Sequence, residues 1–84
     1  MTFEQAVSAL ATKTGMSESD WSDFLAADDA GQKLIVKTYA DMSWAKSPNV
    51  LSDVISILTV LGTIAGAVSG ISGAIGAVSA LKSI

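Results

Sequence analysis

A charge-free tract covering residues 54–81 constrains most strongly what this chain can fold into. The tract is 28 residues long, and residues 1–46 ahead of it carry 11 of the 13 charges of the chain. As a single helix it would span about 42 Å, at roughly 1.5 Å per residue, which exceeds the ~30 Å hydrocarbon core of a bilayer. A surface of that length without charge is not expected to face water on all sides. We therefore expect lipid or other protein to cover it.

The small size of the chain sharpens this expectation. The sequence has 84 residues, of which 50% are hydrophobic and 15% are charged, against a typical charged fraction of about 25%. A chain of this length forms one small unit with a limited interior. Self-association or insertion into a membrane is therefore expected on grounds of surface and volume.

Several function classes are excluded by missing residue types. The chain has no Cys, His or Arg, so it lacks disulfides, the commonest general base and the best bidentate phosphate ligand. Its net charge of −3 argues against nucleic-acid binding as a primary task. We predict a non-enzymatic protein with no cofactor, no metal site and no catalytic residue. The N-terminus lacks the basic region of a secretory signal peptide, so secretion by that route is not expected.

The acidic residues do not assemble into a recognisable site. Glu18, Asp20 and Asp23 lack the glycine and the terminal glutamate of a calcium-binding loop. Asp28 and Asp29 precede a break in the helical pattern, where a helix cap is the simpler interpretation.

Residues 1–46 predict a head of three short amphipathic helices. Thr2 and Gln5 form a capping box at the first helix, which Gly15 ends. Ser17 begins the second helix, and the third is expected over residues 29–45. The predicted apolar faces are Phe3, Ala6, Val7 and Leu10, then Trp21, Phe24 and Leu25, then Leu34, Ile35, Thr38, Tyr39 and Met42.

A boundary lies at Ser47 and Pro48, which suit the cap and first position of a new helix. The expected organisation is therefore a head over residues 1–46 and one long apolar helix within residues 47–84. Nothing after Pro48 forces a stop, although five glycines weaken the helix. The predicted fold class is all-α, with a short helical head, a long Gly/Ala/Ser-rich C-terminal helix and oligomeric helix packing.

Two opposed stripes run along the predicted long helix, each with alternating spacings of four and three. The large face comprises Val50, Val54, Ile57, Leu61, Ile64, Val68, Ile71, Ile75 and Val78. The small face comprises Ser52, Ser56, Thr59, Thr63, Gly66, Gly70, Gly73, Ala77 and Ala80. Small residues allow close approach of helices, so we expect homo-oligomers packed within a bilayer or a large assembly.

Two interpretations stay open for the polar residues of this segment. In a ring of helices the hydroxyls of the small face would line a mildly polar pore, whereas in ordinary helix contacts they would bond locally. Trp44 is either a core residue of the head or an anchor at the membrane interface. If the helix inserts, Lys33, Lys37 and Lys46 before the tract and Lys82 alone after it place the N-terminal half in the cytoplasm.

The segments LGTIAGAV at 61–68 and GISGAIGAV at 70–78 resemble small membrane-active proteins of bacteriophages, both ejection-type virion proteins and holins. The resemblance is one of composition, covers the C-terminal half and transfers no functional residue. It implies a membrane-active or pore-forming component located in a virion, a host membrane or both. The alternatives are a structural adaptor buried in a virion or other assembly, and a holin-like or bacteriocin-like toxin.

Overall fold

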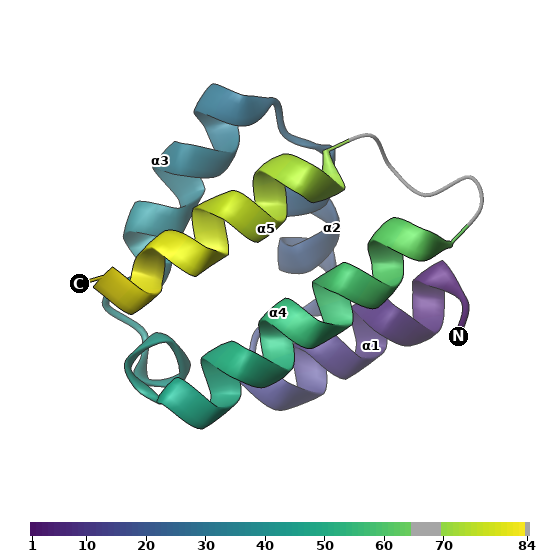
Figure 1. Cartoon of the computed structure of the whole chain (residues 1–84), viewed down its shortest axis with the longest axis horizontal. Coiled ribbons are helices and arrows are strands. Elements are labelled where there is room, and N and C mark those ends of the chain that lie inside the picture. The colour runs from purple at the N-terminus through teal and green to yellow at the C-terminus, as the bar shows by residue number, and fades with distance from the viewer. Residues whose placement is uncertain (65–69, 84) are drawn as a thin grey trace.

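The fold of the protein is all-α, as expected. The computed structural model describes residues 1–64 and 70–83, and every regular element in these ranges is helical (Figure 1). The α-helices are α1 (Phe3–Thr14), α2 (Glu18–Ala26), α3 (Asp29–Tyr39), α4 (Pro48–Thr63) and α5 (Ile71–Ser79). Two short 3₁₀ helices, η1 (Ser43–Lys46) and η2 (Ala80–Ser83), precede α4 and follow α5.

Local capping signals place the first two helices where the sequence predicts them. The Thr2 hydroxyl accepts from the Gln5 backbone N–H, and the Gln5 side chain accepts from the Thr2 N–H, which completes the capping box. Gly15 ends α1 with φ at 75°, a conformation that glycine adopts without a steric penalty. Ser17 caps α2 through the Asp20 N–H. The predicted inward residues of both helices are buried, apart from Phe3, which is half-buried.

The third helix differs from the prediction in length and in orientation. It begins after Asp28, whose carboxylate accepts from the Gly31 N–H at 2.7 Å, and ends at Tyr39 instead of continuing to residue 45. The predicted inward face was wrong at Leu34, which is 65% exposed, and at Thr38, which is exposed. Its other members lie toward the core, with Tyr39 buried and Ile35 and Met42 half-buried. The residues that face the core are Gln32, Val36 and Tyr39. Their spacing of four and three is also helical. A pattern based on apolar residues alone does not predict this face, because one of its members is a glutamine.

The predicted long helix is not present in the structure. As expected, Ser47 caps α4 and Pro48 occupies its first turn. The helix then stops at Thr63, because Ile64 is extended with φ −78° and ψ 126°. Helix resumes at Ile71, and α5 runs back along α4 (Figure 1). Folding back lets the two helices bury apolar residues against each other, a gain that outweighs continuation through a glycine-rich stretch with low helix propensity.

One hydrophobic core holds both halves of the chain together. The buried cluster contains residues of α1 and α2, of α3 and η1, and of α4, α5 and η2. The principal-axis extents are 32 × 25 × 20 Å, so the whole molecule is shorter than the rod of about 42 Å that one 28-residue helix would make. Within the described ranges, no helix has the combination of length and apolarity required to cross a bilayer.

Candidate functional site: the apolar hairpin

The distinctive part of the molecule is the antiparallel pair formed by α4 and α5, here termed the apolar hairpin. Each helix turns one side toward the core, and the spacing on that side is three, four, three in both. The inward residues of α4 are Leu51, Val54, Leu58 and Leu61, and those of α5 and η2 are Ile71, Ala74, Val78 and Leu81. All eight are at most 5% exposed. The hairpin therefore hides its main apolar side inside one chain.

The predicted large face is divided between the core and its border. Its buried members are Val54, Leu61, Ile71 and Val78, its half-buried members are Val50, Ile57, Ile64 and Ile75, and Val68 lies outside the described residues. Besides members of this face, the core includes residues such as Leu51 and Leu58, which the sequence pattern placed on its flanks. Flank residues are buried because α4 packs on both α1 and α5. Its buried side therefore lies between the side that faces α1 and the side that faces α5.

The predicted small face points partly to solvent and partly to α3. Ser52, Ser56, Thr59 and Thr63 are exposed. The hydroxyls of Thr59 and Thr63 donate to the carbonyls of Ile55 at 2.8 Å and Val60 at 2.7 Å. This local bonding is one of the two interpretations left open by the sequence. Gly70 and Gly73 are half-buried, whereas Gly66 lies outside the described residues.

A single polar side chain connects α5 to the head. Gln32 of α3 is 1% exposed, and its amide nitrogen donates to the carbonyl of Phe24 at 3.2 Å and to that of Gly70 at 3.1 Å. The approach leaves no room for a Cβ at Gly73 without a shift of Gln32, because that Cβ would lie 2.6 Å from the Gln32 Oε1 atom. A Cβ at Gly70 would lie 2.9 Å from the Leu25 carbonyl oxygen. Two members of the small face thus allow contact with the chain's own head.

Four aromatic rings fill the centre of the head. Trp21, Phe24, Tyr39 and Trp44 lie with ring centroids 5.4–5.8 Å apart in tilted or edge-on arrangements. The Trp21 indole N–H donates to the Thr14 hydroxyl at 2.9 Å. Trp44, which the sequence left as either a core residue or an anchor at the membrane interface, is 4% exposed and belongs to this cluster. Its position here is that of a core residue.

Two buried polar atoms of the aromatic cluster have no hydrogen-bond partner among the described residues, the Tyr39 hydroxyl and the Trp44 indole nitrogen. Burial raises the pKa of the Tyr39 phenol, and the negative charges of Asp20 and Asp23 add to the effect. The phenol therefore stays neutral in the folded chain at pH values where a solvated tyrosine ionises.

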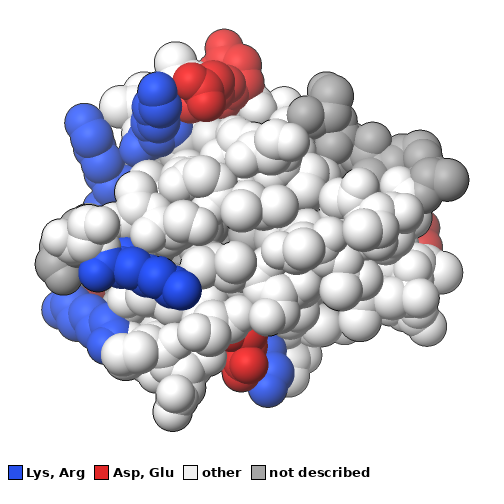
Figure 2. Space-filling model, viewed as in Figure 1, with Lys and Arg blue, Asp and Glu red and all other residues white. Residues whose placement is uncertain are grey.

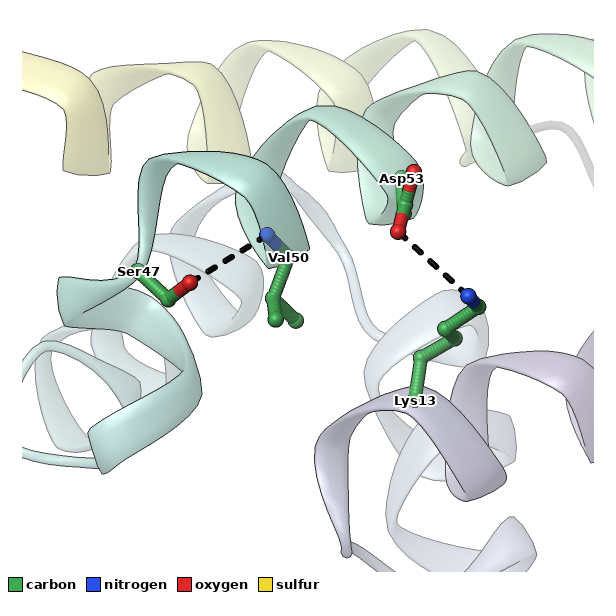
Figure 3. A network of polar contacts seen from close by, with 4 residues as sticks. All are labelled: Lys13, Ser47, Val50 and Asp53. Carbon is green, nitrogen blue, oxygen red and sulfur yellow. Dashed lines mark hydrogen bonds and ion pairs between the residues drawn. The ribbon is translucent and has the colours of Figure 1, made fainter.

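The outer side of the apolar hairpin carries no charge between Asp53 and Lys82. Figure 2 shows this as a broad white surface over both helices, with charged side chains at its borders. Asp53 forms an ion pair with Lys13 of α1 at 3.4 Å, close to the Ser47 cap on the Val50 N–H (Figure 3). Both members of that pair are about half exposed, and such surface pairs contribute at most about 1 kcal/mol.

The arrangement supplies an apolar, uncharged element held against an acidic head. In the parts of the chain that the structure describes, no three potential ligands gather as a metal site. Comparisons with protein-family models, with curated proteins and with solved structures gave no match to this chain.

Proposed function

We propose that the protein is a non-enzymatic, membrane-active component that carries its apolar hairpin folded against its own head until it meets a bilayer. The observation that carries this proposal is the division of the hairpin into an inward apolar side and an uncharged outer side. In water the head covers the apolar side. In lipid, where no charged side chain between Asp53 and Lys82 opposes burial, the same surface is favourable.

Insertion requires the hairpin to change shape. α4 has 16 residues and is about 24 Å long, short of the ~30 Å hydrocarbon core. If residues 48–83 join into one helix, the large and small faces become continuous and the helix becomes long enough to span. Copies would then pack through the small face, which gives the homo-oligomer or pore that the stripes predict. The composition shared with phage virion and holin proteins supports a role at a host membrane.

A disulfide lock tests this opening. A Cβ at Gly62 would lie 3.4 Å from the Ile71 Cγ2 atom, which is bonded to the Ile71 Cβ. The distance between the two Cβ atoms differs from this by at most one carbon–carbon bond, roughly 1.5 Å, a range that includes the roughly 3.5–4.5 Å of a disulfide. The chain has no other Cys, so Gly62→Cys with Ile71→Cys can form only this bond within one molecule. We expect dye release from lipid vesicles with the wild type and the reduced variant, and loss of release when the bond forms.

The Gly62→Cys single variant is the control, because reductant should not change its activity. Equal dye release from the oxidised and reduced double variants would reject the opening of the hairpin. Absence of both dye release and co-flotation with vesicles for the wild type would reject membrane activity altogether.

A second candidate is a structural adaptor packed within a virion or another multi-subunit assembly. It is favoured by the exposed, uncharged outer side of the hairpin, which remains available to another copy when the apolar side is already covered. Molecular mass measured in buffer and in detergent separates the two. A defined oligomer in buffer that detergent leaves unchanged favours the adaptor, and an oligomer that forms only in detergent or lipid favours membrane activity.

A further inference from the structure

The lysines of this acidic chain gather at one end of the fold. Figure 2 shows most of the basic side chains at the end where α5 finishes, away from the end where α4 finishes and α5 begins. We define the basic end as Lys33 and Lys37 of α3, Lys46 of η1 and Lys82 of η2. The remaining lysine, Lys13, lies on α1 and pairs with Asp53. Residues far apart in the sequence thus form a local positive surface on a protein with a net charge of −3.

Most of this positive charge is not neutralised locally. Lys33 pairs with Asp29 at 3.2 Å. In residues 1–64 and 70–83, no carboxylate lies within 4.0 Å of Lys37, Lys46 or Lys82. Asp41, the other acid in this part of the chain, is exposed. Among the described residues, the basic end therefore has four lysines and two nearby carboxylates, Asp29 and Asp41.

Two apolar grooves lie between these lysines. One has a volume of about 560 Å³, with Lys46 and Lys82 at its border and Leu51 and Leu81 among its apolar residues. The other, also about 560 Å³, is lined by Lys33 and Lys37 and by Asp29, the carboxylate that pairs with Lys33. Leu81 lines both grooves. Each groove thus combines an apolar interior with a pair of ammonium groups.

This combination matches the surface of an anionic bilayer. Lysine stems lie along apolar surface while the ammonium groups reach outward to negative headgroups, and each lysine near an anionic membrane adds attraction to it. The apolar interior of the grooves suits the upper part of acyl chains. A nucleic acid would supply the phosphates but nothing for the apolar groove.

We propose that the basic end docks onto anionic lipid bilayers and sets how the molecule approaches them, an inference that rests on the proposed membrane activity. The first helical residues of α4 and the last residues of η2 lie at this end. Docking therefore brings the two ends of the apolar hairpin to the lipid, with the end of α4 and the start of α5 facing away. The contacts between hairpin and head then loosen at the membrane surface.

Flotation with vesicles tests the docking, using phosphatidylcholine alone and phosphatidylcholine mixed with phosphatidylglycerol. We expect binding to the mixed vesicles that weakens as salt is raised. Lys46→Gln with Lys82→Gln should lower the affinity about 30-fold, or about fivefold per lysine. Lys46→Arg with Lys82→Arg, which keeps the charge, should bind as the wild type does. Lys82→Gln should weaken binding more than Lys13→Gln, although both variants have the same net charge.

Dye release measured on the same samples separates this inference from the proposed function. Equal binding to both vesicle types, or equal loss in Lys13→Gln and Lys82→Gln, overturns the docking surface even if dye is released. Lysine-dependent binding without dye release supports the docking surface and rejects the membrane-permeabilising function. Absence of binding to either vesicle overturns both.

Discussion

At the scale of single residues, Tyr39 is an example of a core residue whose buried polar group has no hydrogen-bond partner among the described residues. Its ring contacts Trp21, Phe24 and Trp44, and its hydroxyl is buried without a hydrogen-bond partner in the described part of the chain. An unpaired buried hydroxyl costs free energy that a phenyl group of the same shape avoids. The aromatic packing therefore outweighs the polar penalty at this position.

Tyr39 predicts how stability changes in alkali. The pKa of Tyr39 is raised in the folded chain, so the contribution of this phenol to stability is full below its ordinary pKa of about 10. Above that pH the unfolded chain loses the phenol proton first, and the free energy of unfolding falls. The free energy of unfolding should fall by about 1.4 kcal/mol per pH unit in that range from this group alone. Tyr39→Phe should remove this contribution and match or exceed wild-type stability near neutrality. Urea unfolding of both proteins across the alkaline range measures the difference, and parallel slopes would contradict the prediction.

At the scale of elements, the position of α5 is set by a close approach to α3. Gln32 reaches between the Phe24 and Gly70 carbonyls, and the lack of side chains at Gly70 and Gly73 makes room for it. Glycine normally weakens a helix by up to about 1 kcal/mol relative to alanine. At Gly73, within α5, that loss is offset by contact with the head, whereas Gly70 stands before the helix as its N-cap. Both small residues therefore have a role within the monomer.

Two glycines of α5 provide a matched test of this contact. Gly73→Ala places a Cβ 2.6 Å from the Gln32 Oε1 atom, whereas Gly76→Ala meets nothing within 4 Å. We expect Gly73→Ala to destabilise the fold by about 1–3 kcal/mol through overpacking. Gly76→Ala should stabilise it by about 0.5–1 kcal/mol through helix propensity. Chemical unfolding measures both, and stabilisation by both substitutions would show that the Gln32 approach imposes no constraint.

At the scale of the molecule, the two halves of the chain share one core. α1 packs more extensively on α4 than on its neighbour α2, and α3 packs more on α5 than on α2. The head therefore relies on the apolar hairpin for much of its buried surface, as the hairpin relies on the head. This mutual cover keeps the inward apolar side of the hairpin away from water without a second molecule.

The shared core predicts that a fragment of residues 1–46 does not fold alone. Its helices have 9–12 residues, and isolated helices below about 12–15 residues are marginal in water. We expect low helicity by circular dichroism and no cooperative thermal transition, in contrast to the full chain in the same buffer. A sharp melting transition of the fragment would show that the head is an independent domain.

Local chemistry in the sequence was sufficient to predict the all-α class, the starts of all four helices down to the Ser47–Pro48 boundary, and the inward residues of α1 and α2. These features depend on caps, turn residues and short periodic patterns, which act within a few residues. The tilt of α3 was not predictable in this way, because its inward face includes a glutamine whose partners lie on α2 and at Gly70.

The sequence by itself determined that the stretch without charge needs cover. Only the tertiary structure decided what covers it, namely the head of the same chain, and where the helix breaks to allow this. The physical reason is that burial depends on area removed from water, whatever the surface that removes it. A pattern of apolar residues therefore shows that a surface has to be buried. Whether it is buried against lipid, against another copy or within the same chain depends on contacts between residues distant in the sequence.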